Sequence, residues 1–182
     1  GVHYIDAMRM LLDVQAPVAV TAYWSKSILQ DDRTIPDTSE VTFELPSGTM
    51  MVWGLYEANG GPVIDDGEIE LRGTKGNLIM NNWSGGYRSV PTEGGQFQDR
   101  EALIGKEAAN LISNFLNCTR SRKQPVCDLE TGHRSNTFSL LANIAEEVGR
   151  RLEWDPVNER ITNNEEANEL LHYEYRKPWN LD

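Results

Sequence analysis

The chain has 182 residues, of which 39% are hydrophobic and 25% are charged, a composition typical of one globular domain. Its 17 basic and 28 acidic residues give a net charge of −11, which argues against nucleic acid or an anionic membrane as a partner. No apolar run is long enough to span a bilayer, and no signal peptide is recognisable.

The first predicted element is an amphipathic helix over residues 2–12. Its apolar side chains recur at helical spacing on one face, whereas Asp6, Arg9 and Asp13 fall away from that face. No Ser, Thr, Asp or Asn precedes the pattern to cap its first amides, and no initiator Met is present. We therefore expect the chain to be part of a longer protein.

From residue 17 to about residue 91 the hydrophobic pattern changes to a period of two, which predicts strands. Residues 18–23 and 41–45 alternate as half-buried strands do, and residues 46–48 form a turn. Residues 49–57 are apolar on both faces, as a central strand or a strand beneath an intersubunit contact would be. Residues 68–80 predict a hairpin turning at Gly73-Thr74-Lys75-Gly76.

A segment rich in Gly, Ser and Pro at 83–98 predicts a loop or a short extra strand around Tyr87. Helical spacing then resumes from Ile104 to about Arg120 and again from near Thr131. A capping box at Thr162-Asn163-Asn164-Glu165 predicts a third short helix, ending at Leu171.

A helix, a block of strands and then helices predict an α+β fold, an open, mainly antiparallel sheet with helices packed on one face. The opposite sheet face would carry some of the apolar side chains of residues 50–55. Exposed apolar patches of this kind favour a partner, so we predict a homo-oligomer formed through the open sheet face.

Several signatures of known chemistry are missing from the sequence. The glycine doublets at 60–61, 85–86 and 94–95 do not supply the Gly-x-Gly-x-x-Gly pattern of a dinucleotide site, so we expect no cofactor-binding residues in this chain. Neither a Gly-x-Ser-x-Gly elbow nor a phosphate-binding Walker loop occurs. Cys118, Cys127 and three scattered histidines do not match a zinc pattern, so we expect no metal. Two reduced thiols are favoured over a disulfide, which stays an alternative.

Two polar clusters are candidate sites. His3 and Asp6 are three residues apart on the first helix, where a histidine could move a proton, although a local hydrogen-bonded pair is the commoner meaning of such spacing. His133 and Arg134 follow Asp128 at a helix start, which could hold an anionic or hydroxylated ligand or could simply be a capped, solvated helix end. The loop aromatic residues Trp83 and Tyr87 could stack on a sugar or only anchor the loop.

Strings of residues along the whole chain resemble the glucose-fructose oxidoreductase, inositol dehydrogenase and rhizopine-catabolism family (Gfo/Idh/MocA). No single string is specific to the family, but the number of strings and their order along the chain are. The C-terminal part of the chain resembles a bacterial subgroup of the family. The matching strings are residues 1–6 with 9–12, 32–33 with 36–38, 73–76, 114–118, 120–125, 130–135, 150–156 and 175–179.

The resemblance implies that residues 1–182 are a single C-terminal domain for substrate binding and oligomerisation, without the N-terminal Rossmann domain that binds NAD or NADP. Gly1, His3 and Asp6 match the latter part of the family motif Asp-x-Gly-x-His-x-x-Asp, so His3 resembles the catalytic acid or base. Asp6, His133 and Arg134 are then expected to bind a sugar, polyol or glycoside whose hydroxyl is oxidised. The family's Glu-Lys-Pro lysine belongs to the other domain, and Lys177-Pro178 is not that motif.

The same resemblance leaves two questions open. The full-length protein would use NAD or NADP, whereas this chain alone is expected to bind neither and to be inactive. A stand-alone, non-catalytic module for sugar binding or assembly is the alternative. We expect a cytoplasmic protein, or a periplasmic one if an export signal lies upstream.

Overall fold

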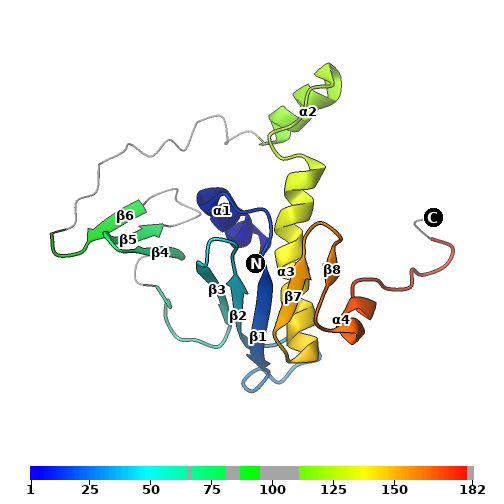
Figure 1. Cartoon of the computed structure of the whole chain (residues 1–182), viewed down its shortest axis with the longest axis horizontal. Helices are drawn as coiled ribbons and strands as arrows, with labels where there is room; N and C mark the ends of the chain where they lie inside the picture. Colours follow the sequence, from blue (N-terminus) through cyan, green and yellow to red (C-terminus); the bar gives the residue numbers. More distant parts are fainter. Residues whose placement is uncertain (65–66, 81–86, 95–110, 180–182) are drawn as a thin grey trace.

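The computed structural model describes residues 1–64, 67–80, 87–94 and 111–179. Its strands form two antiparallel sheets, one of five strands in the order β3-β2-β1-β7-β8 and one of three strands in the order β4-β5-β6 (Figure 1). The elements in chain order are α1 (Val2–Leu12), β1 (Ala19–Ser25), β2 (Thr38–Glu44), β3 (Met50–Tyr56), β4 (Ile69–Gly73), β5 (Gly76–Met80), β6 (Tyr87–Pro91), α2 (Leu111–Ser121), α3 (Leu129–Val148), β7 (Leu152–Asp155), β8 (Arg160–Ile161) and α4 (Glu165–Glu169).

The long helix α3 packs along one face of the five-stranded sheet, as the α+β prediction required (Figure 1). The Asp128 carboxylate caps this helix by accepting a hydrogen bond from the Thr131 amide at 2.8 Å. Phe138 then meets Phe43 of β2 edge to face, with 5.1 Å between ring centroids, and both rings are fully buried. This contact joins the helix to the middle of the sheet.

The structure places β3 at the edge of its sheet, so residues 49–57 are not a central strand. The strands β7 and β8, which the sequence analysis did not predict, extend the sheet on the far side of β1 through pairs such as Val20 with Leu152. The apolar residues of β3 therefore lie in two different environments, one on each face of the sheet. Met51 is buried in the core, while Met50 and Val52 on the opposite face are 68% and 59% exposed.

The predicted hairpin at residues 73–76 is confirmed as the turn between β4 and β5, with Gly76 at a φ of 140° that favours glycine. The predicted extra strand around Tyr87 is confirmed as β6, whereas Trp83 lies outside the described residues. The segment leading into β4 contacts α1, because the Tyr4 hydroxyl donates a 3.1 Å hydrogen bond to the Glu68 carboxylate.

Two helix predictions need correction. The predicted capping box is wrong, because Asn164 caps α4 through the Ala167 amide at 3.1 Å while the Thr162 amide bonds the Glu153 carbonyl. In α2, Leu111–Ser121, no residue is buried, so this helix does not cover the sheet. The residues Ile104 and Ala108, predicted to belong to the same helix, lie outside the described part.

Among the helices that the structure describes, none combines the length and the apolar composition needed to cross a membrane. The described residues also contain no group of three or more His, Cys, Asp or Glu side chains that could hold a metal ion.

Candidate functional site

The first turn of α1 carries His3 and Asp6, and both side chains are accessible. The helix begins at Gly1 without a capping side chain, as predicted, and the Gly1 carbonyl accepts the Tyr4 and Ile5 amides at 3.1 and 3.2 Å. His3 is exposed, and the Asp6 side chain is 50% exposed. Three residues of helical spacing place the two side chains on neighbouring sides of one helix turn.

Arg9 is buried beneath this turn, which corrects the prediction that it lies on the solvent side. Only 7% of the residue is exposed. Its Nε donates to the Val14 carbonyl at 3.0 Å and its Nη2 to the Gln15 side chain at 3.1 Å. Its Nη1 donates to α3, at 2.7 Å to the Ser135 Oγ and at 3.3 Å to the Thr131 carbonyl. A buried guanidinium with all three nitrogens engaged ties α1 to the start of α3.

Ser135 is the residue of α3 that reaches the candidate acid-base pair. It is buried, and its hydroxyl donates a hydrogen bond to the Asp6 Oδ1 while accepting one from Arg9. The Arg9 Nη1 itself is 3.8 Å from the same Asp6 oxygen. The Asp6 carboxylate is therefore positioned by two buried residues, the Ser135 hydroxyl and the Arg9 guanidinium.

His133 and Arg134 lie two residues and one residue before Ser135, respectively, but contact a different part of the molecule. The His133 Nε2 is 2.7 Å from the Glu159 carboxylate, and Arg134 donates at 3.2 Å to the Pro156 carbonyl and at 2.7 Å to Glu130. These partners are in the β7–β8 turn and in α3 itself. The structure thus joins Asp6 to α3 through Ser135, and it does not bring His133 or Arg134 into contact with Asp6.

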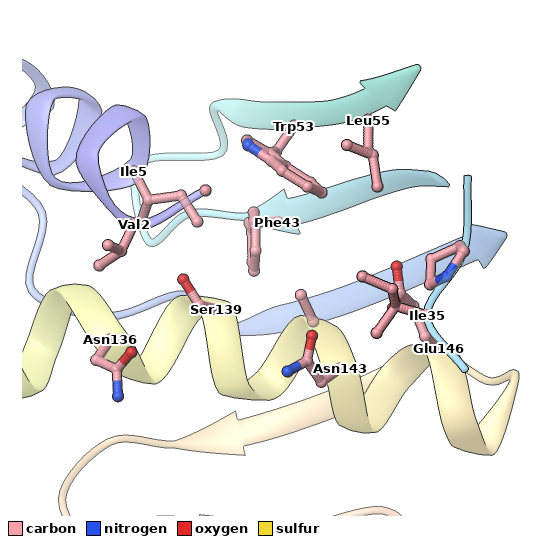
Figure 2. A pocket seen from close by; sticks show the side chains of 13 residues that line it. Val2, Ile5, Ile35, Phe43, Trp53, Leu55, Asn136, Ser139, Asn143 and Glu146 are labelled. Atoms are coloured by element: carbon pink, nitrogen blue, oxygen red, sulfur yellow. The ribbon is translucent and has the colours of Figure 1, made fainter. Parts of the chain in front are cut away.

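A pocket of about 300 Å³ lies beside the N-terminus of α1, on the side that carries Val2 and Ile5 (Figure 2). Figure 2 shows Trp53 and Leu55 of β3 and Val2 and Ile5 of α1 facing α3 across it. The remaining lining residues are Gly1, Ile35, Pro36, Phe43, Asn136, Ser139, Ala142, Asn143 and Glu146. A mostly apolar hollow with a few polar groups on one wall is the usual form of a small-molecule site.

The polar wall of this pocket was missed by the sequence analysis. It consists of Asn136, Ser139, Asn143 and Glu146, spaced by three, four and three residues along α3. That spacing puts them on one helix face, a signal that could have been read as a polar stripe. The buried Ser139 Oγ has no hydrogen-bond partner among the described residues.

The loop that carries Ile35 and Pro36 to the pocket is shaped by a buried carboxylate. The Asp37 Oδ2 accepts backbone hydrogen bonds from Ser27, Ile28 and Leu29 at 3.0, 2.7 and 2.8 Å. These amides, those of Leu29 and Ile28 foremost, hold the pKa of Asp37 below its usual value. Asp37 therefore stays ionised at neutral pH and fixes one rim of the pocket.

The described strands do not have the arrangement of a dinucleotide-binding fold. Every strand pair in both sheets is antiparallel, whereas a dinucleotide fold places its phosphates at a glycine-rich turn between a parallel strand and a helix. A Cβ added to Gly60 or Gly61 would meet nothing within 4 Å, so these glycines do not form a close backbone cradle. At the first turn of α1 the structure presents an exposed imidazole at His3 and a carboxylate at Asp6 that accepts a hydrogen bond from Ser135.

The sequence matches, over residues 1–181, a family model described as oxidoreductase family, C-terminal alpha/beta domain. No curated protein matches it. Similar solved structures include an aldose-aldose oxidoreductase from Caulobacter crescentus complexed with glycerol, at 19% identity and a TM-score of 0.63 over 84% of this chain and 45% of that chain.

A second similar structure is the WlbA dehydrogenase from Bordetella pertussis in complex with NADH and UDP-GlcNAcA. It is 19% identical, with a TM-score of 0.60 over 85% of this chain and 43% of that chain. A third is the UDP-N-acetylglucosamine 3-dehydrogenase GnnA from Acidithiobacillus ferrooxidans, 18% identical, with a TM-score of 0.54 over 81% and 46%. At these identities the likeness concerns the fold, and the chain spans less than half the length of each of the three.

Proposed function

Because the chain belongs to the Gfo/Idh/MocA oxidoreductase family as a C-terminal alpha/beta domain, we propose that it is the substrate-binding and oligomerisation domain of an NAD(P)-dependent oxidoreductase. The substrate class is a sugar, polyol or glycoside, of which one hydroxyl is oxidised. The observation that carries the proposal is the accessible His3 beside an Asp6 carboxylate that Ser135 and Arg9 hold in place.

The names of the similar structures agree with this substrate class. One was solved with glycerol, a polyol, and another with NADH and a nucleotide sugar acid. This chain covers less than half of each of those proteins. We therefore assign NAD(P) binding to the part of a longer protein that this chain does not include, because every described strand pair here is antiparallel, unlike the parallel strands of a dinucleotide fold.

In the proposed reaction His3 accepts the proton of the substrate hydroxyl, as a positioned general base. NAD(P), when bound in the longer protein, supplies the hydride acceptor. Asp6 uses one oxygen to accept from Ser135, and among the described residues no donor reaches its Oδ2, which is available to a neighbouring hydroxyl of the substrate. Two hydroxyls read by adjacent side chains would orient a polyol with respect to His3.

The proposal is tested with the longer protein in which this chain occurs. Incubated with NAD⁺ or NADP⁺ and a panel of aldoses, cyclic polyols and glycosides, it should produce reduced nicotinamide with at least one of them, followed by absorbance. NADH fluorescence should titrate to saturation with the longer protein and should not with residues 1–182 alone. Saturable NADH binding by the short chain, or sugar binding by the longer protein without any turnover, would contradict the assignment.

The oligomerisation half of the proposal rests on the sheet face opposite α3. Met50, Val52 and the 82% exposed Tyr23 project from it. The Tyr56 ring lies over Gly54, where a Cβ would clash with it, and its hydroxyl donates to Glu40. That hydrogen bond and partial burial raise the pKa of Tyr56 to about 12, so the hydroxyl stays protonated and remains a donor to Glu40. A sheet face with exposed apolar side chains of this kind suits a second copy.

Replacing Val52 with Lys should raise the dimer dissociation constant by at least about tenfold, because a charge would be buried in the interface. Light scattering over a micromolar concentration series measures it. Val157→Lys is the control, since Val157 is also exposed, at 86% against 59% for Val52, but lies in the β7–β8 turn. A monomeric wild-type chain, or equal effects of the two lysines, would show that this face does not join subunits.

A further inference from the structure

Arg9 is the only basic side chain that is buried among the residues that the structure describes. A buried guanidinium loses hydration and normally has a carboxylate in direct contact. Here the nearest carboxylate oxygen, the Asp6 Oδ1, is 3.8 Å from Nη1, and the direct acceptors are two carbonyls, an amide oxygen and a hydroxyl. The hydrogen-bond donors of Arg9 are therefore paired with neutral acceptors, and none of them donates directly to the Asp6 carboxylate.

The hydrogen bonds fix the direction in which the Ser135 hydroxyl points. Arginine has only donors, so the Ser135 Oγ must accept from the Arg9 Nη1, at 2.7 Å. A serine hydroxyl carries a single proton, and with one lone pair engaged by Arg9 that proton is directed to the Asp6 Oδ1. Without Arg9 the hydroxyl could rotate and could equally serve as a donor to a nearby helix carbonyl.

Arg9 also holds the two helices in register. Its Nη1 bonds the Thr131 carbonyl in the first turn of α3, and its Nε bonds the Val14 carbonyl just after α1. The position of Asp6 relative to His3 is set by α1, but the rotamer of the Asp6 side chain is set by Ser135. The Arg9 guanidinium bonds both to the segment just after α1 and to Ser135.

We propose that Arg9 is a positioning residue, which acts through Ser135 to hold the Asp6 carboxylate in the orientation that receives a substrate hydroxyl beside His3. This inference rests on the proposed oxidoreductase function. The serine hydroxyl orders Asp6 through one carboxylate oxygen, so the other oxygen is left to accept from the substrate. A direct arginine–carboxylate pair would occupy both oxygens.

The inference predicts a particular kinetic signature in the longer protein. Arg9→Met, which keeps the length and apolar stem but removes every donor, should lower kcat/KM for the sugar or polyol by roughly 10- to 100-fold, the size of a lost charge-assisted hydrogen bond. The loss should fall mainly on the substrate KM, and the KM for NAD(P) should not change. Arg9→Lys should restore little, because one ammonium cannot reach both the acceptors on α3 and those just after α1. Arg150→Met, at an exposed arginine, is the matched control.

A double-mutant cycle with Asp6→Asn separates positioning from mere packing. If Arg9 acts through Asp6, Arg9→Met should cost less than about threefold in the Asp6→Asn background. Equal losses in both backgrounds would show that Arg9 only stabilises the fold, and the inference would be wrong. Should Arg9→Met not fold, the same cycle with Ser135→Ala gives the answer, because this change removes only the relay hydroxyl. A wild-type protein without oxidoreductase activity would instead overturn the proposed function itself.

Discussion

Replacing His3 with Ala in the longer protein is expected to lower kcat by roughly 10²- to 10⁴-fold, the usual contribution of a positioned general base. His3 is the accessible titratable side chain of the first α1 turn, one helical turn from the anchored Asp6. Alanine removes the proton acceptor and leaves the backbone of α1 helical. The loss should therefore concern the chemical step and not the folding of the domain.

Steady-state rates of nicotinamide reduction and an NADH fluorescence titration measure the two consequences separately. Turnover should fall while the NADH dissociation constant stays within about twofold, because this chain does not hold the cofactor in the proposed arrangement. Met10→Ala is the control, since Met10 is 76% exposed on the same helix and carries no titratable group. Undiminished turnover of the His3 variant would remove His3 from the mechanism.

Replacing Phe138 with Ala is expected to lower the free energy of unfolding by about 3–5 kcal/mol. The Phe138 ring is fully buried and meets Phe43 at 5.1 Å, so its loss would leave a cavity between α3 and β2. Both the transfer energy of the ring and the lost aromatic contact contribute. A change of this size is a large fraction of the stability of one domain.

Urea unfolding of the 182-residue chain, followed by far-ultraviolet circular dichroism, measures this change. Leu140→Ala is the control on the same helix, because Leu140 is 52% exposed and its truncation should cost less than about 1 kcal/mol. If Phe138→Ala costs no more than Leu140→Ala, then the contact between α3 and β2 does not hold the sheet and helix together.

The two experiments are linked by the position of Ser135, one helical turn before Phe138 on α3. The contact of Phe138 with Phe43 helps to fix α3 against the sheet, and with it the position of Ser135 beside Asp6. A Phe138→Ala variant that still folds should therefore also show a raised substrate KM, as we expect for Arg9→Met. The same helix, α3, thus carries both a core residue, Phe138, and a residue that contacts the candidate site, Ser135.

The elements whose hydrogen bonds are local were predicted closely from the sequence. The helix of residues 2–12 has the predicted bounds, because a period of 3.6 apolar residues is a property of the segment itself. The turn at 73–76 was predicted from its glycines, whose backbone angles need no distant partner. The family, and with it His3 and Asp6 as candidates, also came from ordered strings of residues.

The strand order was decided by the tertiary structure. Leu152 and Glu153 pair with β1, more than 130 positions earlier in the chain, and extend the sheet on that side. β3 is at the opposite edge because β4, the next strand in the chain, pairs in the other sheet. Short strands with little alternation give no sign of such a partner, since the stabilising contacts are cross-strand and non-local. The pocket has the same origin, because α1, β3 and α3 each contribute one wall.

The candidate site was also predicted only in part from the sequence. Sequence spacing placed His3 and Asp6 on one helix turn, and the family resemblance added His133 and Arg134 as substrate-binding candidates. Only the packing of α3 against α1 decided that Ser135 is the residue in contact with Asp6 and that Arg9 is buried below it. The physical reason is that a polar residue on a helix edge can face either water or another helix, and the local pattern is the same in both cases.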